Sequence, residues 1–110
     1  MKQIILFFLL FTAFTANSQN IFSTEYSHQA DVKVFVCDYE HQADLLVYKV
    51  SYEHQAGNND GLWYFCEYEH QADAKIYFVD YEHQADLKIF FVDYQHQADW
   101  KDDSKKHLLY

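Results

Sequence analysis

Six histidines at equivalent positions are the residues of this chain that most directly suggest chemistry. Five of them are followed three residues later by an aspartate, and an imidazole nitrogen with a carboxylate oxygen is a common ligand pair for divalent metals. A metal site gathers several ligands at one point, whereas this pair is spread evenly along the sequence. We therefore predict no metal or cofactor site, with metal binding as the alternative. We interpret the histidines as scaffold residues copied with a repeated unit: His28, His41, His54, His70, His83 and His96.

Covalent catalysis is disfavoured by the same repetition. A nucleophile with its base and orienting acid needs an asymmetric set of residues, which near-identical units make hard to build. Ser27, Ser51 and Ser104 occupy positions that hold acids or loop residues in the other copies of the repeated unit. We predict no catalytic residue and no enzymatic activity. Only the insertion 58–61, Trp63 and the C-terminal tail break the symmetry, so a specific partner is expected there.

The two cysteines raise the question of a disulfide. Cys37 and Cys66 share one position of the unit, which three other units fill with valine: Val50, Val79 and Val92. Export of the chain would permit a bridge, but the shared position does not make the two thiols neighbours. Two buried thiols that replace valine are the preferred interpretation, and a bridge is the alternative.

A repeat supplies the elements that must position these side chains. The signature YEHQAD occurs in six exact or near-exact copies, with Tyr, His, Gln and Ala at fixed offsets in each. Tyr39 follows Tyr26 by 13 residues, and Tyr68 follows Tyr52 by 16, because three residues are inserted there. Gly57 replaces the aspartate of the third copy. Such periodicity sets the architecture of a chain. The signatures span residues 26–31, 39–44, 52–57, 68–73, 81–86 and 94–99.

A leader precedes the repeats. Lys2, an apolar run from Ile4 to Phe11 and a small or polar segment are typical of a secretory signal peptide. The rival interpretation, a membrane anchor, needs an apolar run of roughly 20 residues. We predict a signal peptide at 1–18, cleaved after Ser18, and a single β-repeat domain at 19–110. The mature chain would be bacterial, secreted or periplasmic, without a membrane span.

Composition narrows the class of partner. The chain holds 17 acidic and 8 basic residues, a net charge of −9, and it has no Arg. Such an acidic chain is not typical of proteins that bind nucleic acid or anionic membranes. The partner stays unknown, and we expect a monomer. Half of the residues are hydrophobic, which argues against disorder.

Each unit reads as one strand followed by a turn, because aromatic and β-branched residues precede each signature. We call the residues at one position of the repeated unit a column. Side chains alternate between the two faces of a strand, which places three columns on one face, and we assign this face to the core. In the fifth unit these are Tyr77, Val79 and Tyr81, and the opposite, partly covered face holds Ile76, Phe78 and Asp80. The assignment predicts that Tyr81→Ala and Ala85→Leu cost several kcal/mol. It also predicts that changes at Phe65 and Glu82 cost less than half as much.

The pattern alone permits three assemblies: an antiparallel meander closing as a barrel, a short β-solenoid, or a closed ring of strands linked by crossovers. Closure is favoured because it removes edge strands. The repeated unit KIYFVDYEHQAD, from Ile21 to about Trp100, and the ending KKHLLY resemble the septoil-knot family of small bacterial proteins of unknown function. This resemblance implies a compact, closed all-β arrangement of six 13-residue strand-plus-turn repeats that winds into a seven-crossing knot.

The function expected from the sequence is that of an exported, non-enzymatic β-repeat domain with a structural or binding role. The alternative is a divalent-metal or pH-responsive binding protein that uses the repeated His and Asp turns. A titration with zinc or copper separates the two.

Overall fold

The computed structural model describes residues 19–57 and 59–109, so the predicted signal peptide at 1–18 lies outside the described residues. Each unit forms a short strand, and a turn of 3-10 helix follows at the signature. In each turn the Gln backbone N–H donates to the Tyr carbonyl at 2.9–3.1 Å. The strands are β1 (Asn20–Ser23), β2 (Val32–Val36), β3 (Leu45–Lys49), β4 (Leu62–Phe65), β5 (Ala74–Phe78), β6 (Leu87–Phe91) and β7 (Asp99–Trp100). The helical turns are η1 (Ser27–Gln29), η2 (Glu40–Gln42), η3 (Glu53–Gln55), η4 (Glu69–Gln71), η5 (Glu82–Gln84), η6 (Gln95–Gln97) and η7 (Asp103–Leu109).

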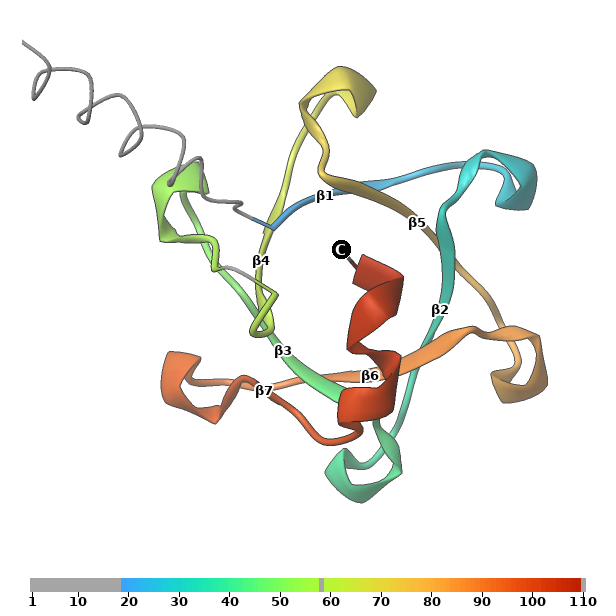
Figure 1. Ribbon diagram of the computed structural model, residues 1–110, viewed down its shortest axis with the longest axis vertical. Helices are drawn as coiled ribbons and strands as arrows, with labels where there is room; N and C mark the ends of the chain where they lie inside the picture. The colour runs from blue at the N-terminus through green and yellow to red at the C-terminus, as the bar shows by residue number, and fades with distance from the viewer. Residues whose placement is uncertain (1–18, 58, 110) are drawn as a thin grey trace, which may run out of the picture.

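Six parallel strands close into a barrel in the order β4-β1-β5-β2-β6-β3, and β3 pairs back to β4 (Figure 1). From β1 to β3 each strand lies two places beyond the one before it, and β5 and β6 fill the gaps. The short β7 runs antiparallel to β3. The predicted closed all-β arrangement of repeats is therefore confirmed, as a ring of parallel strands rather than a meander or a solenoid.

The barrel interior is filled by the columns five and seven residues before each signature Tyr. Ile21, Val34, Val47, Trp63, Ile76 and Ile89 are all 0% exposed, and Val32, Leu45 and Leu87 lie beside them at 0–1%. The face assignment from the sequence was therefore wrong, because this is the face expected to be only partly covered. The signature Tyr residues lie outside, at 57–63% exposure. The physical reason is that the strand ends three residues before the Tyr, so period-two alternation no longer applies to it.

A second, smaller apolar layer covers part of the outside of the barrel, at β2, β3 and β6. Cys37, Ala43, Leu46 and Val92 are buried there, with Phe35, Tyr48 and Phe90 packed against them half-buried. The layer includes residues two or four positions before the Tyr of units two, three and six. Of the signature alanines, Ala43 belongs to this layer and the other five are half-buried. The sequence contains two apolar faces, and only closure of the ring decides which becomes the interior.

The tail and the insertion close the barrel where its symmetry breaks. η7 lies over the centre of the ring (Figure 1), and its Leu109 is buried in the core while Leu108 packs against it. The backbone carbonyl of Asn59 accepts from Trp100 Nε1 at 2.9 Å, and Asn59 Nδ2 donates to the Lys106 carbonyl at 3.1 Å. The insertion is thus tied to the tail, at the one connection among the described strands whose two strands pair directly. In the described part of the chain, no helix is long and apolar enough to cross a bilayer.

Candidate functional site

Each of the six turns η1–η6, together with the Tyr before it, projects outward from the barrel, and we call these projections corners one to six in chain order (Figure 1). In every corner the Tyr ring stacks on the imidazole two residues later. The ring centroids are 5.8–6.0 Å apart and the planes differ by 13–24°. The pairs are Tyr26–His28, Tyr39–His41, Tyr52–His54, Tyr68–His70, Tyr81–His83 and Tyr94–His96.

The Tyr–His pairs lie in solvent. The Tyr residues range from 57% exposed at Tyr26 to 63% at Tyr52, and the six histidines are exposed as well. Within residues 19–57 and 59–109, none of the six imidazoles makes a hydrogen bond or an ion pair. The pairs therefore contribute to no buried layer of the fold. The same chemistry is presented at six places on the outside of one barrel.

The aspartate that ends the signature has a structural role instead. Asp86 donates its backbone N–H to the Lys33 carbonyl at 2.8 Å, and its carboxylate accepts the Lys33 N–H at 3.0 Å. We call this two-bond contact a clamp, and it fastens the end of one turn to the strand alongside. Three further clamps join Asp31 to Lys75, Asp44 to Lys88 and Asp73 to Asn20. These four carboxylates therefore take part in holding the fold together.

The glutamine of the signature also serves the turn. Gln55 Oε1 accepts the Tyr52 backbone N–H at 3.0 Å, and Gln97 Oε1 accepts that of Tyr94 at 3.1 Å. Such side-chain bonds satisfy an N–H that the short helix leaves without a partner. The fold thus uses the signature Asp in four clamps, the Gln side chain in corners three and six, and the Ala as a buried or half-buried residue. The Tyr and His rings stack on each other and are exposed in all six corners.

The residue after the Tyr distinguishes one corner from another. Glu69 and Glu82 form ion pairs with Lys75 and Lys88, at 3.2 and 3.3 Å. Glu53 Oε2 accepts a hydrogen bond from Asn20 Nδ2 at 2.9 Å. Corners one and six have no acid here, because Ser27 and Gln95 take the position. Glu40 in corner two is the remaining member, and in the described part of the chain its carboxylate has neither a hydrogen-bond partner nor an ion-pair partner.

Metal binding and the two thiols are the remaining candidate chemistry. No group of three or more His, Cys, Asp or Glu side chains with metal-binding geometry occurs among the described residues. Cys37 and Cys66 are both free and buried, which confirms the preferred interpretation of the two cysteines. Burial raises the pKa of both thiols, so the protonated, unreactive form is favoured.

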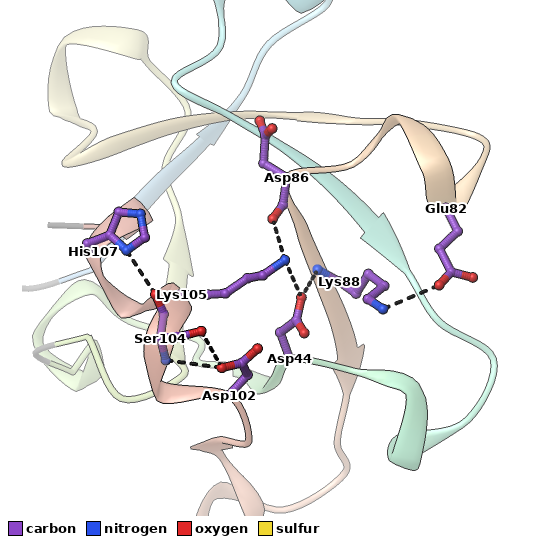
Figure 2. Close-up of polar contacts among 8 residues, drawn as sticks. All are labelled: Asp44, Glu82, Asp86, Lys88, Asp102, Ser104, Lys105 and His107. Carbon is purple, nitrogen blue, oxygen red and sulfur yellow. Dashed lines mark hydrogen bonds and ion pairs between the residues drawn. The ribbon is translucent and has the colours of Figure 1, made fainter.

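One Ser, His and Asp do meet, in the tail, and their geometry is not that of a catalytic triad. The Ser104 hydroxyl donates to Asp102 Oδ1 at 2.6 Å, while His107 Nδ1 contacts the Ser104 carbonyl rather than its hydroxyl (Figure 2). The hydrogen bonds from Ser104 lower the pKa of Asp102. Nearby, Lys105 Nζ lies 3.6 Å from Asp44 Oδ2. These contacts order η7 and attach it to the barrel.

The places where the sequence breaks symmetry are buried only in part, because Asp60, Lys101 and His107 are exposed, and a partner site there stays a prediction. Trp63 is 0% exposed inside the barrel, Asn59 is 5% exposed beneath the tail, and the tail itself packs over the core. The corners were not predicted from the sequence, because the alternation of apolar residues placed the Tyr column in the core. Two signals in the sequence point to them. The Tyr lies beyond the strand, and exposed acids lie on one or both sides of it in every unit.

A family model described as 7(1) septoil knot domain matches residues 18–101. No curated protein and no solved structure matches the chain.

Proposed function

The chain belongs to the family of 7(1) septoil knot domains, and on this premise we propose that it is an exported, non-enzymatic binding domain whose six corners are its binding surfaces. The observation that carries the proposal is the repeated, exposed Tyr–His pair, at 57–63% Tyr exposure in all six corners. A Tyr ring offers large contact area at little cost in conformational entropy, which is why Tyr is enriched in interfaces.

Two further features support binding rather than catalysis. The corners are near-identical and lie on separate turns, so they offer six similar contacts instead of one asymmetric constellation. Asp of the signature forms clamps in four units and Gln bonds its own turn in two, whereas Tyr and His are exposed in all six. Several weak sites on one rigid body also raise overall affinity for a partner that engages more than one of them.

The binding proposal is tested by nuclear magnetic resonance on the isotope-labelled domain. A panel of a deca-lysine peptide, cellohexaose and phosphatidylglycerol vesicles is titrated while the ring signals of the six Tyr–His pairs are followed. We expect at least one member of the panel to shift corner signals and to leave the buried Ile signals in place. Shifts confined to other surfaces, or none with any probe, would overturn the proposal.

Export rests on the leader at 1–18 and is tested separately. The full chain expressed in a bacterium with a secretion pathway should yield a mature protein whose N-terminal residue is Gln19. An intact Met1 on the folded protein would refute export and leave the binding proposal untouched.

A further inference from the structure

The position after the Tyr is occupied by an acid in four corners, and three of these acids already have a partner within the chain. Lys75 and Lys88 pair with their glutamates in corners four and five, and Asn20 contacts the glutamate of corner three. Glu40 of corner two is the exception within the described residues. The question is what takes the place of the missing partner.

The sequence explains why Glu40 differs from its repeat mates. Each paired lysine lies six residues after its glutamate, and the residue six positions after Glu40 is Leu46. Leu46 is 6% exposed and packs in the outer apolar layer. An aliphatic side chain at this position has no charge to offer. The Glu40 carboxylate of corner two therefore has no lysine beside it among the described residues, whereas Lys75 and Lys88 pair with the equivalent carboxylates of corners four and five.

Corner four shows what fills such a site when a cation is available. Lys75 Nζ lies 3.2 Å from Glu69 Oε2, and the same lysine, Tyr68, Glu69 and His70 line one shallow surface hollow of about 470 Å³. An ammonium group is thus accommodated beside the Tyr–His pair and its glutamate. Lys88 lies equivalently, 3.3 Å from Glu82 in corner five. These two corners are internal examples of a lysine bound at the site that corner two leaves open.

Charge and aromatic character both favour a cationic occupant at corner two. Asp38 and Glu40 are exposed on either side of Tyr39 in the sequence, and Tyr39 is 62% exposed. The chain as a whole has a net charge of −9, which attracts basic partners over long range. The face of a Tyr ring also attracts an ammonium group. An ammonium group already lies over an aromatic ring elsewhere in this protein, because Lys49 Nζ is 5.1 Å from the ring centroid of Phe91.

We propose that corner two binds a lysine side chain of a basic polypeptide partner, with Glu40 as the ion-pair acceptor and Tyr39–His41 as the aromatic wall. This inference rests on the proposed function, since it names the partner of one of the corners. A single solvent-exposed ion pair changes affinity only about two- to fivefold. The partner therefore presents several lysines, so that neighbouring carboxylates and Tyr rings are engaged together.

The experiment titrates the labelled domain with deca-lysine at about 20 mM and about 200 mM salt, because screening weakens exposed ion pairs. We expect the largest shifts at Tyr39 and His41 and weaker binding at the higher salt. Glu40→Gln should weaken binding about two- to fivefold. Glu82→Gln is the matched control, since it removes the same charge from a glutamate that Lys88 already neutralises, and it should leave the shifts at corner two in place.

Two reciprocal variants test the site beyond its charge. Leu46→Lys gives corner two the lysine of its repeat mates and should abolish the shifts at Tyr39. Lys88→Leu removes the internal cation from corner five and should create a second responsive site at Tyr81. The Lys88 backbone N–H, which donates to Asp44 at 3.0 Å, is unaffected by the second change. If Leu46→Lys fails to fold, Glu40→Gln and Lys88→Leu still decide the matter.

Three results would overturn the inference. Equal weakening by Glu40→Gln and Glu82→Gln would mean that net charge alone attracts the peptide. Shifts of equal size at all six corners would mean that the open carboxylate has no special role. Corner shifts with cellohexaose and none with deca-lysine would refute the basic partner while leaving the corners as binding surfaces.

Discussion

The sharpest prediction tests which face of the strands lies inside the barrel, and it compares the stability of Ile89→Ala with that of Tyr81→Ala. Ile89 is 0% exposed in the barrel core. Its truncation removes three buried carbons, worth about 2.4 kcal/mol at about 0.8 kcal/mol each, and leaves a cavity that raises the cost to about 3 kcal/mol or more. Tyr81 is 62% exposed, so only about a third of the cost of a buried aromatic applies, or about 1 kcal/mol.

Urea unfolding measures both variants, with the fluorescence of Trp63 and Trp100 as the signal because both are buried. At an m-value of about 1.5 kcal/mol/M, the losses lower the midpoint by about 2 M for Ile89→Ala and by about 0.7 M for Tyr81→Ala. Ile89→Val, expected to cost about 1 kcal/mol, replaces the first variant if it does not fold. Phe65→Ala should lower the free energy of unfolding more than Tyr81→Ala does, because Phe65 packs against the core. A Tyr81→Ala midpoint as low as that of Ile89→Ala would refute the burial argument.

Three further outcomes are expected. Asp86→Ala breaks one clamp and should cost about 1 kcal/mol of unfolding free energy, while the same change at an exposed aspartate outside the clamps should be neutral. The Cys37 and Cys66 thiols, whose pKa burial raises, should react slowly with a thiol reagent until the protein unfolds, and the folded mass should not change on reduction. Because Ser104 lowers the pKa of Asp102, the contribution of this contact to η7 should be intact above the ordinary Asp range and lost as pH falls through the lowered pKa. Ser104→Ala should move the Asp102 pKa upward in a carbon-detected titration.

The closed β-repeat architecture could be predicted because it depends on local and periodic features. Aromatic and β-branched runs favour strands, and signatures that recur every 13 residues, with one insertion, predict equivalent units. Burial of Cys37 and Cys66 could be predicted for the same reason, because three other units place valine at the position of these cysteines. The alternation itself could not say which face closes inward. Both faces are apolar, and a period of two is symmetric between them.

The candidate site was less accessible, since it depends on contacts between units far apart in the chain. The sequence shows that Glu40 precedes a leucine where Glu69 and Glu82 precede a lysine. It does not show that those lysines fold back onto their own corners. Nor does it show that the signature aspartates are engaged by strands alongside, as Asp86 is by Lys33.

The sequence by itself determined the number of units, the strand in each and the turn that follows it, because these depend on residues near one another in the chain. The tertiary structure alone decided the strand order, the inner face and which polar groups stay available. Closing the ring buries Ile89 and its equivalents, which leaves Tyr81 and its equivalents on turns outside the barrel. Burial and pairing are properties of the closed barrel, and no single unit can bury its apolar face alone.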